Sequence, residues 1–176
     1  MSNLGWVGEL RQPILAKPVS PHTKPPGELA LTSAQSSSTL QHMTFDELYK
    51  QAKSVINPRR LSEDAEAGGV GAALLTESGK VYTGTCIDTA CSMGFCAEHA
   101  AAAAMITAGE SRVVKMIAVG WDGRVMPPCG RCREFISQLH QENLNAEVMV
   151  SEETIVTLRE LLPYDWRSAT ATNRTQ

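Results

Sequence analysis

Two short segments of this chain carry residue types that bind soft metals and move protons. Residues 95–99 read Phe-Cys-Ala-Glu-His, and residues 128–132 read Pro-Cys-Gly-Arg-Cys. Zinc favours thiolate ligands, and a Cys-x-x-Cys step at a helix start places Cys129 and Cys132 on one face of the first turn. Cys96 would supply a third thiolate. The three cysteines predict one zinc ion per chain, with a fourth position open for water.

Glu98 follows Cys96 by two residues, so on a helix its side chain points well away from that ligand. It is therefore free to carry protons. An open zinc position beside a carboxyl group whose pKa is raised in a secluded pocket suits hydrolytic deamination. The carboxyl group would take a proton from water and pass it to a ring nitrogen and then to the leaving amine. The layout predicts Glu98 as the catalytic proton carrier.

Two other interpretations use the same residues. Cys96 and His99 are three residues apart and could face one way, so that with Cys129 and Cys132 they would form a closed Cys3His structural site. Glu98 would then have no task, and the chain would be a catalytically silent, zinc-stabilised module. Thioredoxin-like redox proteins also carry Cys-x-x-Cys, but their motif expects no third cysteine partnered with a glutamate.

Composition is that of an ordinary globular protein. Of the 176 residues, 43% are hydrophobic and 20% are charged. The formal net charge is -3 and no basic cluster is larger than the one at Arg59 and Arg60, which disfavours a polynucleotide partner. No apolar run approaches the roughly 20 residues of a membrane span, and no signal peptide is evident. With an odd count of five cysteines, this predicts a reducing, cytoplasmic location, where Cys-x-x-Cys is more often metal-binding than disulfide-bonded.

The elements that must position these residues predict an α/β domain. Residues 1–42 are rich in Pro, Ser, Thr and Gln and are predicted to be a poorly ordered leader. Residues 43–166 are predicted to form the zinc domain, and residues 167–176 a polar tail. Capping residues and hydrophobic periodicity predict a first helix over 44–56, a loop to 69, and a hairpin of strands 70–76 and 80–87. A loop over 88–95 then leads to a buried central helix over 96–107 and a strand over 113–121. The last elements predicted are a loop over 122–128, a helix over 129–141, a strand over 147–151 and a helical turn over 158–162. Crossovers between the later strands predict that these are parallel, and both cysteine segments open helices.

At these residues the chain resembles the cytidine deaminase superfamily. Residues 96–98 and 128–133 stand as in the small single-domain nucleoside deaminases and in blasticidin S deaminase. Residues 70–74, 80–84 and 160–163 look like the family's first strand, second strand and C-terminal signature. The likeness covers about residues 44–166. It implies a three-layer α/β/α sandwich with a mixed, mostly parallel sheet, one catalytic zinc, a small-molecule nucleoside substrate, and a homotetramer whose sites borrow loops from neighbouring copies.

The resemblance also implies roles for individual residues. It implies that Cys96, Cys129 and Cys132 are the zinc ligands and that Glu98 is the proton shuttle. The Ala97 N–H and the Pro127 carbonyl would contact the base, and His99, Arg131 and Arg133 would support the site. His99 stands where the tetrameric enzymes often carry an arginine that hydrogen-bonds the thiolates. Its charge, unlike that of arginine, depends on pH.

Departures from the family pattern fall on the substrate contacts. Nucleoside deaminases carry Gly-x-Asn-x-Glu at the end of the second strand to hold the ribose, and the matching positions here are Cys86 and Asp88. Asp88 is a shorter acceptor, and Cys86 is a poor substitute for an amide. Trp166 could supply an aromatic wall, since the family often ends in an aromatic residue there. The sequence predicts deamination of a cytosine nucleoside such as cytidine or deoxycytidine, with a cytosine-containing antibiotic of the blasticidin S type as the alternative substrate.

Overall fold

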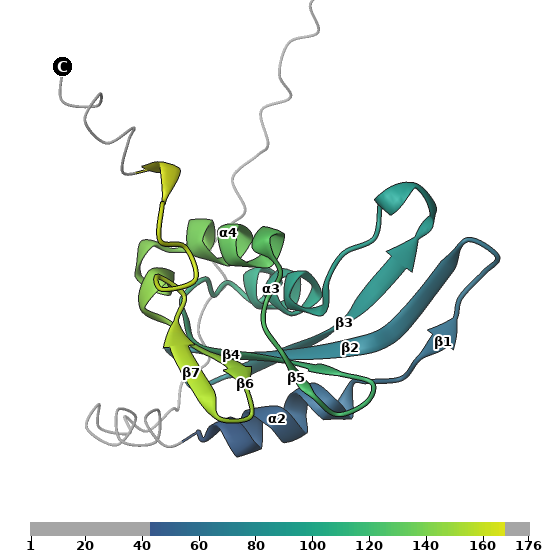
Figure 1. Cartoon of the computed structure of the whole chain (residues 1–176), viewed down its shortest axis with the longest axis horizontal. Helices are drawn as coiled ribbons and strands as arrows, with labels where there is room; N and C mark the ends of the chain where they lie inside the picture. The colour runs from purple at the N-terminus through teal and green to yellow at the C-terminus, as the bar shows by residue number, and fades with distance from the viewer. Residues whose placement is uncertain (1–42, 168–176) are drawn as a thin grey trace, which may run out of the picture. The chain divides into compact units, whose positions relative to one another are not determined.

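The computed structural model describes residues 43–167, so the predicted leader and the tail after residue 167 lie outside the described residues. The described part forms one mixed sheet between two layers of helix. Helix α2 (Phe45–Ser54) covers one face, and α3 (Ala97–Thr107) and α4 (Gly130–Leu139) cover the other (Figure 1). The predicted α/β class and the α/β/α layering are confirmed.

The sheet contains seven strands within residues 43–167, in the order β1-β2-β4-β6-β7, with β3 paired to β2 and β5 to β4. Their bounds are β1 Arg59–Arg60, β2 Ala65–Thr76, β3 Val81–Thr89, β4 Val113–Gly120, β5 Val125–Met126, β6 Glu147–Ser151 and β7 Thr154–Thr157. Only β4 and β6 pair in parallel, while the other five pairings are antiparallel. The prediction of a mostly parallel sheet is therefore wrong. Short turns join β2 to β3, β4 to β5 and β6 to β7, and such turns allow only antiparallel pairing.

Local sequence signals predicted the bounds of the helices more accurately than those of the short strands. The predicted capping box is present, because the Glu47 N–H donates to Thr44 Oγ1 over 3.2 Å and the Thr44 N–H donates to Glu47 Oε2 over 2.7 Å. The loops predicted over 57–69 and 122–128 instead contain β1, the start of β2, and β5, and β7 was not predicted. Strands of two to four residues are too short to show an alternating pattern. Short 3-10 turns, η1 (Ala90–Ser92) and η2 (Gln141–Asn145), flank the helices of the site.

Apolar residues of β2 and β4 build a core on each face of the sheet. Leu48 of α2 packs with Leu75 and Ile117 on one face. On the other, α3 and α4 cover a cluster that includes Leu74 and Met116. Consecutive residues of β4 are buried on opposite faces, as predicted for a strand covered on both sides.

Helix α3 lies unusually close to β3. A Cβ atom at Gly84 would lie only 2.2 Å from the backbone nitrogen of Ala101. The prediction of a buried central helix holds for the inner face of α3, while its outer face is open to solvent in the single chain, with Ile106 46% exposed. The helix ends in a Schellman motif at Gly109, which has φ +84° and was predicted as its C-terminal glycine.

Gly84→Ala is expected to destabilise the fold by about 1–3 kcal/mol or more, because the added methyl group meets helix backbone and not a flexible side chain. Urea unfolding followed by circular dichroism measures this. Gly130→Ala is the matched control, since a Cβ atom there meets nothing within 4 Å. Equal unfolding midpoints for the two variants would contradict the close packing of α3 on β3.

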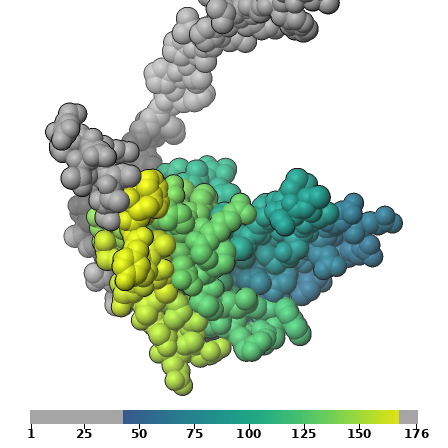
Figure 2. All heavy atoms as spheres, turned by 45° about the horizontal axis from the view of Figure 1, so that its top comes forward, coloured from purple at the N-terminus to yellow at the C-terminus, as the bar shows by residue number. Residues whose placement is uncertain are grey.

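The connection from β1 to β2 and the connection from β3 to α3 project on the same side of the described domain (Figure 1 and Figure 2). Among the helices of residues 43–167, none combines the length and the apolar character needed to cross a membrane.

Candidate active site and metal centre

The two cysteine segments lie at the beginnings of neighbouring helices. Cys96 is the N-cap residue of α3 and Cys129 is the N-cap residue of α4, both with extended backbones. Glu98 and Cys132 therefore fall in the first turns of the two helices. Helix N-termini present unpaired N–H groups and a partial positive charge, which favours anions such as thiolates at this place.

The sulfur atoms converge at spacings that suit zinc. Cys129 Sγ lies 3.5 Å from Cys96 Sγ and 3.5 Å from Cys132 Sγ. Zinc–sulfur bonds of about 2.3 Å in a tetrahedron would place two sulfurs roughly 3.8 Å apart. His99 Nδ1 lies 3.3 Å from Cys132 Sγ, and the ligand atoms of Cys96, His99 and Cys132 all lie within 4.8 Å of one another. The donor set fits zinc, either with three thiolates or with His99 as a fourth ligand.

The thiols differ in how readily they lose their protons. Burial raises the pKa of Cys96 to about 11 and, together with the charge of Glu98, raises that of Cys132 as well. For Cys129, burial acts in the same direction but is outweighed by hydrogen bonds from the backbone of Cys132 and Arg131 and from neighbouring thiols, so its pKa is lowered. Zinc must displace thiol protons when it binds, so acid weakens its binding.

Glu98 lies beside these sulfurs and is 4% exposed. Burial raises the pKa of its carboxyl group, with its own backbone N–H and the Cys132 side chain opposing that shift. A carboxyl group with a raised pKa holds a proton more readily near neutral pH and can release it again. The environment thus gives Glu98 the property that a proton carrier needs.

His99 stacks on Phe135 of α4, with ring centroids 4.4 Å apart and an angle of 8° between the planes. Burial and the charge of Arg131 lower the His99 pKa. A neutral imidazole can hydrogen-bond the Cys132 sulfur or bind metal through the same nitrogen. Phe135 was not predicted as part of the site, although its spacing of three residues from Cys132 places both on one helix face.

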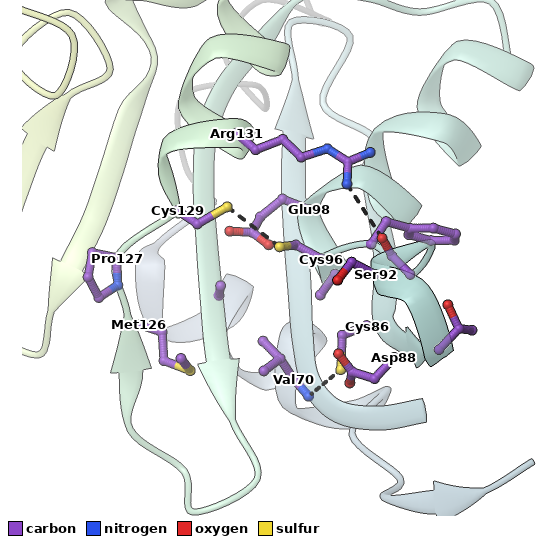
Figure 3. A pocket seen from close by; sticks show the side chains of 15 residues that line it. Val70, Cys86, Asp88, Ser92, Cys96, Glu98, Met126, Pro127, Cys129 and Arg131 are labelled. Atoms are coloured by element: carbon purple, nitrogen blue, oxygen red, sulfur yellow. Dashed lines mark hydrogen bonds between the residues drawn. The ribbon is translucent and has the colours of Figure 1, made fainter. Parts of the chain in front are cut away.

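A cavity of about 460 Å³ opens onto the sulfurs (Figure 3). The structure brings four of the five predicted substrate residues to its walls, namely Ala97, Pro127, Cys86 and Asp88. Arg131, predicted to support the site, also lines the cavity, as do Cys96, Glu98 and Cys129. Sequence reasoning missed other lining residues, among them Val70, Thr89, Ser92, Ala118 and Met126. The sulfur of Cys86 accepts a hydrogen bond from the Val70 N–H over 3.3 Å, which fixes its position in the wall.

The two arginines of the second segment support the loops around the cavity. Arg133 Nε donates to the Pro128 carbonyl over 2.7 Å, and Arg131 donates to the Gly94 carbonyl over 3.4 Å. The carbonyl predicted to contact a base belongs to Pro127, the residue before the carbonyl that Arg133 binds. Both arginines therefore act on backbone next to the cysteines.

Trp166 is not among the residues that line this cavity in the single chain, and its role as a substrate wall stays a prediction. Its indole N–H donates to Glu134 of α4 over 2.8 Å, and the next residue, Arg167, donates to Ser137 of the same helix. These hydrogen bonds hold the end of the described chain along α4. Arg167 was predicted to begin a frayed tail but is bound there.

Comparison with known proteins identifies the family. Residues 44–148 match the family model described as the cytidine and deoxycytidylate deaminase zinc-binding region. The chain belongs to this family. Its family membership and the zinc cofactor, both predicted from the cysteine segments, are thereby confirmed.

One relative of this family member is the cytidine deaminase of Mycobacterium tuberculosis, which is 37% identical over 68 residues. The match covers 38% of this chain and 51% of the relative. The match thus spans about half of that relative's length. The cytidine deaminase of Halalkalibacterium halodurans is 35% identical over 103 residues, covering 53% of this chain and 74% of the relative. A crystal structure of the M. tuberculosis cytidine deaminase is similar with a TM-score of 0.60 and 26% identity, covering 70% of this chain and 98% of that one.

Proposed function

We propose that this protein catalyses zinc-dependent hydrolytic deamination of a cytosine-containing nucleoside, such as cytidine or deoxycytidine, to the uracil compound with release of ammonia. The observation that carries the proposal is the position of Glu98. Its buried carboxyl group lines the same cavity as Cys96 and Cys129, whose sulfurs converge with that of the buried Cys132 at two helix N-termini. Two of the curated relatives and the similar crystal structure are cytidine deaminases.

In this proposal Cys96, Cys129 and Cys132 hold zinc, which when bound supplies the electrostatic activation of water that the reaction requires. Glu98 accepts a proton from the attacking water and delivers it to the ring nitrogen of the base. It then carries the proton of the added hydroxyl group to the amino group, which leaves as ammonia when its carbon–nitrogen bond breaks and the hydroxyl oxygen becomes the carbonyl oxygen of the product. The Ala97 N–H and the Pro127 carbonyl orient the base in the cavity.

A second candidate substrate is a cytosine-containing antibiotic of the blasticidin S type. The observation that favours it is the wall at Cys86, whose sulfur already accepts a hydrogen bond from Val70 and offers little to a sugar hydroxyl. Asp88 lies in the same wall, and its carboxylate can accept hydrogen bonds from a substrate there.

The proposal includes a homo-oligomer, with a tetramer as the expected form, in the cytoplasm. What supports an oligomer is apolar surface at the cavity mouth and on α3: Phe95 is 37%, Met126 41% and Ile106 46% exposed. Another copy of the chain would remove these side chains from water. Sedimentation of the full chain measures the assembly.

A substrate panel tests the activity. Zinc-loaded full-length protein is expected to release ammonia from cytidine or deoxycytidine faster than from free cytosine or adenosine, with blasticidin S included for the second candidate. Ammonia is followed with a coupled assay and the products by chromatography. No turnover of any compound by protein that retains its zinc would refute the proposed function.

A further inference from the structure

A second cavity of about 500 Å³ adjoins the first on the side away from the sulfurs. The two cavities share Val70, Cys86, Asp88 and Met126 in their walls, and the second continues past them to Gly69, Trp121 and Arg124. Pockets of roughly 300–1,000 Å³ suffice for drug-sized ligands, so the first cavity alone has room for a nucleoside. The second, called the distal cavity below, is space that a bare nucleoside does not need.

Small residues keep the passage between the two cavities open. Cys86 stands at the junction with its sulfur held by the Val70 N–H, and it is 8% exposed. Gly69 faces that sulfur without a side chain of its own. At Gly120 a Cβ atom would lie 2.9 Å from Asp122 Oδ1 and 3.2 Å from the Met126 sulfur, both in the wall of the distal cavity. A larger residue at Gly120 would therefore displace one of these two wall side chains.

Trp121 gives the distal cavity an aromatic wall. Its side chain is 75% exposed, although its backbone N–H is fixed by a hydrogen bond of 2.8 Å to the Gly69 carbonyl. An exposed tryptophan on a fixed backbone can stack on a ligand group with little loss of conformational entropy. The face of an indole ring attracts cations in particular.

Within its lining the distal cavity has two carboxylates, Asp88 and Asp122, and one cation, Arg124, while Arg131 lines the first cavity. Asp88 has no hydrogen-bond or ion-pair partner among the side chains of residues 43–167 and lies directly across the sheet from Glu66 of β2. Like charges at such opposed positions destabilise a strand pair. In the distal cavity Arg124 Nε lies 2.5 Å from Asp122 Oδ2, so the cation there is already paired. Asp88 is left as an uncompensated carboxylate between the two cavities.

We infer that the distal cavity binds a cationic arm, an ammonium or guanidinium group, carried on the sugar side of the substrate. This inference rests on the proposed function, because a ring that places its amino group at the sulfurs must direct its sugar toward Cys86 and Asp88. The arm passes Cys86, pairs with Asp88 and stacks on Trp121. An anionic arm such as a phosphate would meet the Asp88 carboxylate first.

Matched substrates test the charge preference. The cationic probe is 5′-amino-5′-deoxycytidine acylated with β-alanine, the neutral probe is its N-acetylated form, and the anionic probe is cytidine 5′-monophosphate. For the zinc-loaded full chain, kcat/KM is expected to be about tenfold higher for the cationic than for the neutral probe at low salt. Raising the salt to about 0.5 M should reduce this ratio severalfold, because exposed charges are screened.

Variants locate the preference. Trp121→Ala and, separately, Asp88→Asn should each bring the ratio of cationic to neutral kcat/KM close to one. Tyr164→Ala is the matched control, since this aromatic side chain is 97% exposed and lies in neither cavity, and it should leave the ratio unchanged. A wild-type ratio near one, a preference for the phosphate, or a ratio insensitive to both variants would overturn the inference. If no compound of the substrate panel is deaminated, the proposed function fails; if a nucleoside of the panel is deaminated and the ratio is one, only the inference fails.

Discussion

Glu98→Gln is expected to lower kcat for nucleoside deamination by about 10²–10⁴-fold while the protein keeps its zinc. Glutamine has nearly the same shape as glutamate and fits the same buried place, but its amide cannot accept a proton and release it again. The effect should fall on kcat, because base orientation rests on Ala97 and Pro127. Steady-state ammonia release measures kcat, and metal analysis of the same sample measures zinc.

Glu134→Gln is the matched control for this substitution. Glu134 also lies on a helix of the site, but its carboxylate faces Trp166 and Gln138 outside the cavity, so the rate should stay near that of the parent protein. Thermal unfolding of both variants excludes loss of fold as the cause. A Glu98→Gln protein that keeps the parent rate would remove Glu98 from the proton transfer and with it the basis of the proposed mechanism.

The core of the site could be predicted from sequence because it depends on local geometry. Cys129 and Cys132 are brought together by one helical turn, and Glu98 is directed by its place in the first turn of α3. Capping and periodicity also fixed the helices, since each helix carries its signals within its own residues. Only the meeting of the two segments is nonlocal, and for that the family resemblance supplied the expectation.

What the sequence did not predict depends on contacts between distant residues. Met126 reaches the cavity because β5 pairs with β4, with Met126 opposite Ala118, and a two-residue strand leaves no pattern to detect. Trp166 turns away because Glu134 accepts its indole N–H. The wall of the distal cavity includes Gly120 and Asp88, which the register of β3 sets opposite Glu66, and neither residue alters the periodicity of its strand.

Cysteine and histidine substitutions should separate the two zinc arrangements. In the proposed open site Cys96, Cys129 and Cys132 are ligands, and His99 donates to the Cys132 sulfur. Cys132→Ala should then abolish zinc retention through purification, because two thiolates remain where three held the ion. His99→Ala should keep close to one zinc per chain while binding it about 10–100-fold more weakly, as for loss of a group that orients a ligand. Metal analysis and competition with a chromophoric chelator measure both effects.

His99→Gln is the control that distinguishes a hydrogen-bond donor from a ligand. The glutamine amide can donate to sulfur but is a poor zinc ligand, so in the open site it should restore part of the affinity lost in His99→Ala. In a closed Cys3His site both histidine variants would lose zinc as readily as Cys132→Ala, and no position would be left for water. The spacing of 3.3 Å between His99 Nδ1 and Cys132 Sγ accommodates either bonding pattern. Activity depends on which one forms, because only the open site leaves Glu98 a water from which to take a proton.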